Sequence, residues 1–225
     1  MGHPVRLFQI WTMLISHHKH FIFIHNYKVA GVSIKRSLSG AKNAAAESGG
    51  LTTLQKRVLR IWSNNSIYKF RDHMTAADLK KEIPPGIFKR YFKFGFVRNP
   101  WDHQVSLYEY MRSSPDHFQH KEISMLKDFE EYIDWRVNRN VHFQKDFFFE
   151  GDECLVDFIG KYEHLERDFH TVCRRLGIQA GLQHLNKSPR YSDYRQYYSS
   201  RTIELVAEAF DEDIRLFGYE KPALG

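Results

Sequence analysis

The stretch 21-FIFIHNYKVAGVSIKRSL-38 contains the pattern that decides the fold. Residues 21–25 are short, apolar and rich in aromatic side chains, which is typical of a buried strand. Residues 31–40 have the composition of a short helix that ends at Gly40. Lys28 lies in the turn between them. A strand, a tight turn with a cation and a helix raise the question of which anion this turn binds.

Strands and helices continue to alternate along the rest of the chain. Two further strands are predicted at 92-FKFGFV-97 and 155-LVDFIGKYE-163. Apolar residues at helical spacing predict further helices at 75–83, from Pro100 onward, and at 127–137, 165–176 and 203–217. This alternation predicts an α/β fold in which a parallel sheet is covered by helices on both faces. We expect residues 1–225 to form a single domain, because no convincing linker interrupts them.

Helix-capping residues support two of these helices. Thr75 is a plausible N-cap for the first, which stops at Pro84-Pro85. Asn99 followed by Pro100 is typical of a helix start. The helix after Pro100 carries an apolar stripe that we expect to pack against the sheet, made of Trp101, Val105, Tyr108 and Met111.

Composition sets broad limits on the function. The net charge of +6 suits polyanions, nucleotides, acidic glycans or a membrane surface, but it does not choose among them. Cys154 and Cys173 are too few for a disulfide framework, and Cys173 falls on an apolar helical face where a buried thiol is expected. No apolar run reaches the ~18–20 residues of a spanning helix. The apolar patch at 7–15 lacks a cleavage site for a signal peptide, so we expect a cytoplasmic location.

The turn after the first strand has the features of an anion site. In an open parallel sheet, ligands bind beyond the carboxyl ends of the strands, where a helix N-terminus offers N–H groups. Gly31 lets the backbone approach an oxyanion closely, Ser33 adds a hydroxyl group and Lys28 adds a positive charge. The turn is not a Walker A motif, which requires lysine directly after glycine. We also find no persuasive apolar strand that ends in an acidic residue to hold Mg²⁺, so an ATP hydrolase or kinase is disfavoured.

A second turn repeats the arrangement. In 96-FVRNPWDHQVSLYEYM-111, Arg98 lies at the carboxyl end of a strand that leads into a capped helix. Ser106 lies on the helix face that it shares with Asp102. Two such sites in one sheet predict a ligand with two separated anionic groups.

The two turns together resemble a known family. KVAGVS and FVRNPWDHQVSLY are similar to the signature turns of sulfotransferases that use 3′-phosphoadenosine-5′-phosphosulfate (PAPS), most closely those of the carbohydrate (membrane-type, heparan- or chondroitin-like) branch. Segments further along the chain resemble that branch too: VDFIGKYEHLERDF, HLNKSPR and DYRQYYSSRTIELVAEAFDEDIRLFGYE. The resemblance implies a P-loop-NTPase-like sulfotransferase fold, no metal requirement and donor contacts from Lys28, Val29, Ala30, Gly31, Val32, Ser33, Arg98 and Ser106. In that family the first turn holds the 5′-phosphosulfate and the second holds the 3′-phosphate.

The chain departs from the family pattern at four positions. Val29 and Val32 replace threonines that could contact the phosphosulfate. His103 replaces an arginine, and Tyr27 replaces a proline. We interpret these changes as weakening individual contacts, because backbone N–H groups can still form the cradle.

The resemblance implies an O-sulfotransferase that acts on a carbohydrate hydroxyl. Lys28 is expected to stabilise charge on the leaving 5′-phosphate oxygen. His73, in 70-FRDHMTAADL-79, resembles the histidine general base of carbohydrate sulfotransferases, and Asp72 and His25 are the alternatives. In the C-terminal loop HLNKSPR, we expect contacts to phosphates or to an anionic acceptor from Lys187 and Arg190, with Ser188 as a further donor-binding residue.

Two other functions stay open at this point. One is a sulfotransferase for a small alcohol, phenol or lipid headgroup, and the other is a nucleotide- or polyanion-binding module without catalysis. No nucleic-acid partner and no membrane span are expected. The cluster 17-HHKH-20 lacks a carboxylate or cysteine partner, so we reject it as a metal site. The aromatic residues 147–149 are expected in the core or an interface more than in a sugar platform, and acceptor specificity is expected from loops 39–66 and 112–125.

Overall fold

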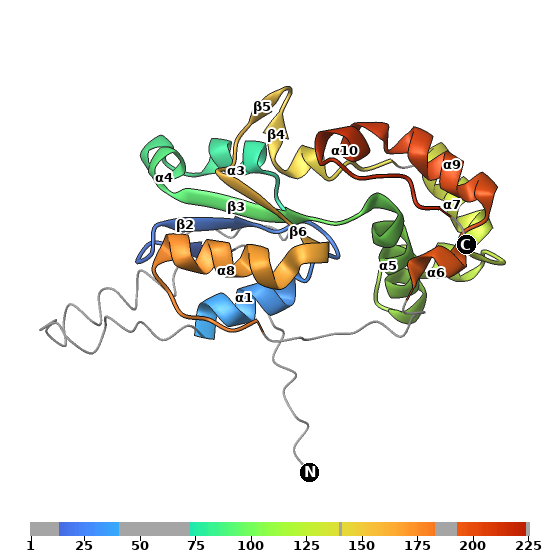
Figure 1. The fold of residues 1–225 in the computed structure, drawn as a ribbon, viewed down its shortest axis with the longest axis horizontal. Coiled ribbons are helices and arrows are strands. Elements are labelled where there is room, and N and C mark those ends of the chain that lie inside the picture. The colour runs from blue at the N-terminus through green and yellow to red at the C-terminus, as the bar shows by residue number, and fades with distance from the viewer. Residues whose placement is uncertain (1–13, 41–72, 140, 183–192, 224–225) are drawn as a thin grey trace, which may run out of the picture.

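The fold is built on a four-stranded sheet of order β1-β2-β3-β6 (Figure 1). The computed structural model describes residues 14–40, 73–139, 141–182 and 193–223. The strands of the sheet are β1 (Leu14–Ser16), β2 (Phe21–Ile24), β3 (Phe92–Val97) and β6 (Phe158–Lys161). The last three run parallel, as predicted, whereas β1 pairs antiparallel with β2. The α/β prediction is therefore confirmed, with the correction that the sheet is mixed because an antiparallel edge strand was missed.

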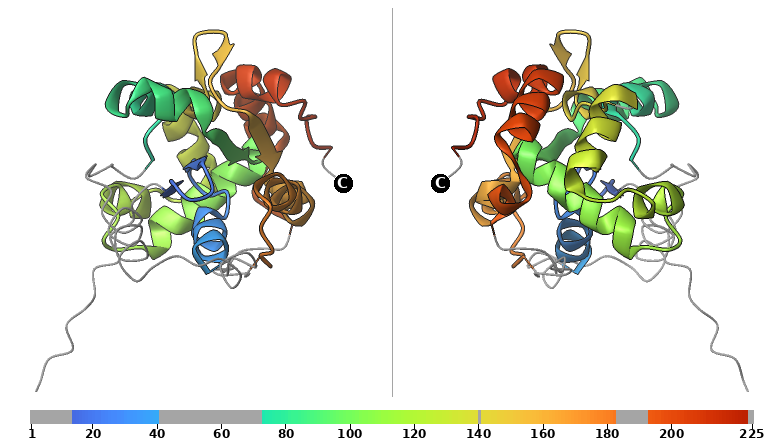
Figure 2. Two further views of the ribbon diagram at one scale, coloured as in Figure 1. Left: turned by 90° about the vertical axis from the view of Figure 1, so that its left-hand side faces the viewer. Right: turned by 90° about the vertical axis from the view of Figure 1, so that its right-hand side faces the viewer.

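Helices cover both faces of the sheet (Figures 1 and 2). Because successive side chains of a strand point to opposite faces, the phenylalanines of β2 and β3 pack on one side with α1 (Gly31–Gly40) and α8 (Leu165–Leu176). Ile22, Ile24 and Val97 point to the other side, toward α3 (Ala76–Glu82) and α4 (Pro85–Arg90). Burying each such side chain contributes roughly 1.5–3 kcal/mol.

The aromatic residues 147–149 belong to this second face. A Cβ atom at Gly95 of β3 would lie 2.2 Å from the Phe148 ring, so the glycine makes room for this fully buried side chain. Phe147 and Phe149 pack in the same cluster, which confirms the core interpretation. Nearby short elements are η1 (Lys145–Phe147), β4 (Phe149–Glu150) and β5 (Glu153–Cys154).

A helical layer lies beside the sheet (Figure 1). It consists of α5 (Pro100–Ser113), α6 (His120–Ser124), α7 (Phe129–Arg139) and α9 (Ser200–Ala209). The predicted stripe of α5 packs against side chains of α7 and α9, such as Tyr132, Ile133 and Ile203. The expected contact with the sheet was therefore wrong, because a stripe shows which face of a helix is buried but not its partner. The segment 112–125, predicted as a loop, contains α6.

The predicted single C-terminal helix at 203–217 is also wrong. The chain leaves helical geometry at Phe210, with φ −114° and ψ 24°, and resumes as α10 (Asp211–Leu216). The break turns the buried Asp213 carboxylate toward the backbone N–H groups of Gln144 and Lys145, at 2.7 and 2.9 Å. Three acidic residues in the first turn of α10 favour a new helix start there.

Other predicted boundaries shift by a few residues. The third strand covers only 158–161, and its predicted end forms η2 (Tyr162–His164). The caps at Thr75 and Asn99 are confirmed, and the helix after Thr75 stops before Pro84-Pro85 as predicted, with Pro85 beginning the further helix α4. Cys173 is a buried free thiol, as predicted. Within the described ranges, no helix is both long and apolar enough to cross a membrane.

Candidate active site

The turn between β2 and α1 has a strained backbone. Lys28 and Ala30 adopt φ values of 55° and 62°, in the left-handed region that non-glycine residues rarely occupy. The Ala30 carbonyl accepts the first hydrogen bond of α1, from Ile34 N at 3.0 Å. The N–H groups of residues 31–33 precede that bond, in the first turn of α1. Such N–H groups are the donors that a helix N-terminus offers to an anion.

Gly31 has a packing role in this turn. A Cβ atom at this position would lie 1.9 Å from Nε2 of His25. His25 is 6% exposed, and the ring fills the space beside the glycine. Glycine is thus required at this position because the His25 ring fills the space that a side chain would occupy. The close approach of an oxyanion to Gly31 stays a prediction.

The two valines of the turn differ in their surroundings. Val29 is fully buried and packs in the core with Phe23 and Ile34. Val32 is half-buried. A residue at position 29 can therefore offer a ligand only its backbone, so the exchange of threonine for valine there removes no accessible hydroxyl group.

Arg98 joins the two turns. Its Nη1 donates to the Lys28 carbonyl at 2.9 Å, and its Nε pairs with the Asp102 carboxylate at 2.6 Å. The guanidinium lies 4.0 Å from the ring centroid of Tyr162. Nη2 has no hydrogen-bond partner among the described residues, although Arg98 is only 3% exposed. Leaving a buried donor unsatisfied is costly, which makes Nη2 a group that an anionic ligand could satisfy.

The N-terminus of α5 is capped from within the protein. The Asn99 side chain accepts from the N–H groups of Trp101 and Asp102, at 3.0 and 3.3 Å. The N–H of Asn99 itself donates to the Glu163 carboxylate at 2.6 Å. The second turn therefore presents a guanidinium group to a ligand, with the first backbone N–H groups already used.

His103 and Gln144 fix the positions of the two turns by hydrogen bonds. Nε2 of His103 donates to the Tyr27 carbonyl at 3.1 Å. Burial, reinforced by the charges of Arg98 and Arg136, lowers the pKa of His103 to about 3. Position 103 thus carries a neutral, buried support for the first turn in place of the family's arginine.

Gln144, which precedes η1, bonds to both strand ends. Its Oε1 accepts from the Arg98 N–H at 2.9 Å and from Nδ2 of Asn26 at 3.0 Å. Its Nε2 donates to the Arg98 carbonyl at 2.7 Å. Sequence reasoning missed this residue, because no local motif marks a glutamine whose partners lie 46 and 118 positions away.

His73 lies against the first turn. Its Nδ1 is 2.9 Å from the His25 carbonyl, and its ring stacks on Tyr27 with a centroid distance of 3.9 Å. A carbonyl can only accept, so Nδ1 carries the proton and the neutral ring has its lone pair on Nε2. His25 itself is held neutral, because burial and the nearby charges of His73 and Lys35 lower its pKa to about 2.

Lys28 extends toward α5. Its ammonium group lies 3.9 Å from the ring centroid of Tyr110, a cation–π contact. His117, further along the chain, has a lowered pKa owing to burial and to the charge of Lys28. Tyr110 and His117 were not predicted as site residues, although both lie in or next to the segment expected to set specificity.

The structure brings most of the predicted residues together. At the neighbouring ends of β2 and β3, the described part of the site contains Lys28, Val29, Ala30, Gly31, Val32, Ser33, His73 and Arg98. Ser106 is buried on α5, at 2% exposure. Asp72, Asn186, Lys187, Ser188 and Arg190 lie outside the described residues.

The family model of the sulfotransferase family matches residues 11–220 of the chain. The chain belongs to the sulfotransferase family. An uncharacterized protein of Archaeoglobus fulgidus is 28% identical over 131 residues, which cover 55% of this chain and 98% of that protein. Membership supports sulfuryl transfer as the general chemistry, and a match of this extent includes both turns.

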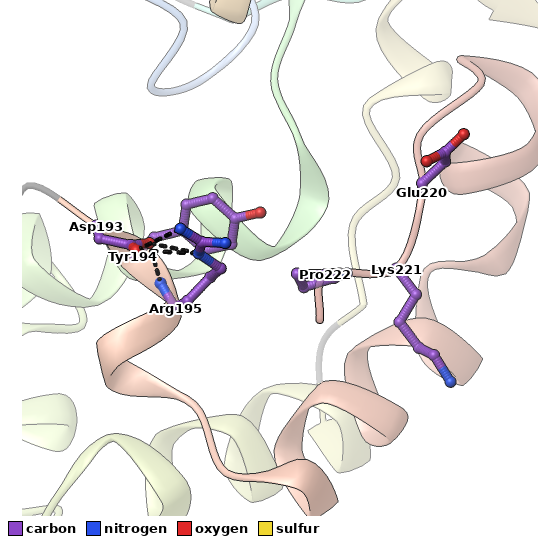
Figure 3. A pocket seen from close by; sticks show the side chains of 6 residues that line it. All are labelled: Asp193, Tyr194, Arg195, Glu220, Lys221 and Pro222. Carbon is purple, nitrogen blue, oxygen red and sulfur yellow. Dashed lines mark hydrogen bonds and ion pairs between the residues drawn. The ribbon is translucent and has the colours of Figure 1, made fainter. Parts of the chain in front are cut away.

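A pocket lies between residues 193–195 and the C-terminal segment (Figure 3). It has a volume of about 580 Å³. Arg195 is paired with Asp193 at 2.7 Å, and Lys221 is paired with Glu204 at 2.8 Å. Because both cations already have carboxylate partners, we do not assign an anion site here.

The histidines at 17–20 pack on an aromatic side chain. Nδ1 of His17 is 2.8 Å from the Tyr91 hydroxyl, and the His20 ring lies 5.1 Å from the Tyr91 ring. In the part of the chain that the structure describes, no group of three or more histidine, cysteine or acidic residues could hold a metal ion.

Proposed function

We propose that this protein transfers a sulfuryl group from PAPS to a hydroxyl group of a carbohydrate acceptor. The observation that carries the proposal is the direct link between the two turns, in which Arg98 Nη1 donates to the Lys28 carbonyl at 2.9 Å. This link places a lysine and an arginine at neighbouring ends of parallel strands β2 and β3. Sulfotransferases generally use PAPS, whose two separated anionic groups match two such turns.

The first turn would hold the phosphosulfate. PAPS supplies an activated sulfuryl group whose transfer breaks the bond to the 5′-phosphate oxygen and forms a bond to the acceptor oxygen. The backbone N–H groups of residues 31–33 and the Ser33 hydroxyl surround the helix start, where the dipole favours negative charge. Lys28 would stabilise charge on the leaving oxygen, and its cation–π contact with Tyr110 keeps its ammonium at this end of the sheet.

The second turn would bind the 3′-phosphate. Arg98 supplies a buried guanidinium, and the unpartnered Nη2 is the group available to an added oxyanion. Ser106 lies one turn beyond Asp102 on the same helix. We further propose that Lys187, Ser188 and Arg190 complete the donor site, as the family resemblance implies.

His73 would act as the general base. The proton on Nδ1 is fixed by the His25 carbonyl, so Nε2 is the ring nitrogen that can accept a proton from an acceptor hydroxyl. His25 is less suited, because its ring is buried against Gly31 and its pKa is lowered to about 2. A general base of this kind contributes about 10²–10⁴-fold in rate.

Two features favour catalysis over a binding module without turnover. Val29 points into the core, so the valine at this position is no evidence that contacts to the donor, and with them catalysis, were lost. His73 is oriented by a backbone hydrogen bond and by stacking, which a surface histidine does not need.

Binding of adenosine 3′,5′-bisphosphate tests the donor assignment. We expect this nucleotide to raise the melting temperature more than ADP or AMP does, because neither carries a 3′-phosphate. Arg98→Lys should remove most of the difference, since an ammonium cannot reproduce the guanidinium fork. Equal stabilisation by all three nucleotides would contradict the proposal.

Sulfation assays with PAPS then test the chemistry. We expect Lys28→Ala and His73→Ala to lower kcat by about 10²-fold or more, without loss of folding. Lys127→Ala is the matched control, because Lys127 is an exposed lysine just before α7 that pairs with Asp128. Full activity of His73→Ala would remove its role as base and leave the donor assignment standing.

A further inference from the structure

Three ring side chains contact one another in a row next to Lys28. Tyr110, near the end of α5, meets the His117 ring edge-on at a centroid distance of 5.5 Å. His117 stacks on Phe118 at 4.7 Å, with an angle of 28° between the ring planes. The Lys28 ammonium lies over the Tyr110 ring at 3.9 Å. We refer to Tyr110, His117 and Phe118 as the aromatic platform.

The fold does not need the platform for its core. Phe118 is 87% exposed and Tyr110 is 41% exposed, among the most exposed large apolar side chains of the described residues. No platform residue belongs to a buried cluster, although Tyr108 and Met111 of the same helix do. Solvent exposure of one phenylalanine is ordinary, but three rings in contact beside a functional lysine are the kind of exposed apolar surface that marks a binding site.

We propose that the aromatic platform binds the acceptor by stacking against the apolar C–H face of a pyranose ring. The inference rests on the proposed function, because it takes Lys28 as the centre of transfer. One face of Tyr110 contacts Lys28, and the His117 ring lies between Tyr110 and Phe118, so the stacking surface for the sugar is the open face of Phe118. Tyr110 connects this surface to the reaction centre.

The chemistry of the platform suits a sugar. A pyranose offers one apolar face for stacking and a rim of hydroxyl groups for hydrogen bonds. His117 adds polar ring nitrogens to the platform, and its Nδ1 accepts from the Gln119 N–H at 3.2 Å. Tyr27, the residue before Lys28, is half-exposed and stacks on His73. A sugar on the platform therefore lies close to the first turn, against which the proposed base His73 packs.

Saturation-transfer NMR with desulfated chondroitin and desulfated heparan oligosaccharides tests the platform without requiring turnover. We expect ring C–H signals of the sugar to show contact with the protein, and Phe118→Ala to weaken binding about fivefold to tenfold. Phe118→Trp should restore it, because stacking needs a ring and not phenylalanine itself. Met125→Ala is the matched control, since Met125 is 78% exposed in the same part of the chain but belongs to no ring stack.

The outcomes separate this inference from the proposed function. Oligosaccharide binding that is equally strong in Phe118→Ala overturns the platform. Binding of p-nitrophenol with none of the oligosaccharides also overturns it, and indicates a planar phenolic acceptor. If adenosine 3′,5′-bisphosphate raises the melting temperature no more than ADP or AMP does, only the donor site is contradicted. Sugar binding that depends on the Phe118 ring would still support the platform.

Discussion

The backbone at Lys28 and Ala30 stores strain where the proposed chemistry takes place. Each residue adopts a left-handed conformation, which costs an L-residue roughly 1–2 kcal/mol. Sequence analysis predicted a turn here from a single glycine, but Gly31 is not one of the left-handed residues. The residues with positive φ could not be predicted, because the hydrogen bond from Arg98 to the Lys28 carbonyl comes from another strand end.

We expect Ala30→Gly to raise the free energy of unfolding by about 0.5–1 kcal/mol. Glycine removes the Cβ conflict at φ 62°, and this gain exceeds the extra entropy of the unfolded chain. Chemical denaturation of both proteins measures the change. Ala77→Gly in α3 is the matched control, because helical geometry makes the same exchange destabilising there. A loss of stability in Ala30→Gly would contradict the assigned backbone conformation.

Tyr27 is a positioning residue for His73. It occupies the place of the family's proline and stacks on the histidine ring at 3.9 Å. We expect Tyr27→Phe to retain activity, and Tyr27→Ala to lower kcat about tenfold with little change in the KM for PAPS, since only the orientation of the base is lost. The pH profile of kcat should change in Tyr27→Ala and not in Tyr27→Phe. Identical profiles in all three proteins would mean that the stack has no role in catalysis.

For helices and strands, interactions between residues close in the sequence were predicted well, whereas interactions between distant residues were not. The caps at Thr75 and Asn99 depend on residues within three positions, so the sequence contains the whole interaction. The partner of the α5 stripe and the break at Phe210 depend on elements far along the chain. Asp213, which explains the break, satisfies N–H groups 69 and 68 positions away.

Gln144 shows how much one long-range residue contributes to these elements. Its side chain makes three hydrogen bonds to Asn26 and to the backbone of Arg98. We expect Gln144→Ala to lower the free energy of unfolding by about 3 kcal/mol or more, because it leaves several buried polar groups without partners. Gln196→Ala, at an exposed position in η3 (Tyr194–Tyr197), should change it by less than about 0.5 kcal/mol. Similar small effects for both variants would show that water replaces the lost bonds.

For the whole molecule, the sequence predicted the class of fold and the two turns, because strand–turn–helix units repeat along it. It could not predict that buried histidines join those turns to the rest of the protein. His103 supports Tyr27, and the carbonyl of His25 orients His73. Both rings are buried without charge, so the stability of the fold depends on pH.

These buried histidines should make the fold sensitive to acid. Burial lowers the pKa of His25 to about 2 and that of His103 to about 3, well below the unfolded value of about 6.5. Between these values the unfolded chain binds more protons, so the stabilisation is complete above about pH 6.5 and is lost as the pH falls. Asp213 acts in the opposite direction: burial raises its pKa to about 6, so protonation below pH 6 favours the folded state.

We therefore expect the free energy of unfolding to fall between pH 7.5 and pH 5, by about 2 kcal/mol for each of the two histidines, with part of the loss offset by Asp213. His103→Gln keeps an N–H donor for the Tyr27 carbonyl but cannot take up a proton. Urea unfolding of both proteins at the two pH values should show about 2 kcal/mol less acid destabilisation in the variant. A variant with the same pH dependence as the parent protein would mean that His103 is protonated in the folded state, and that the support of the first turn does not require a neutral ring.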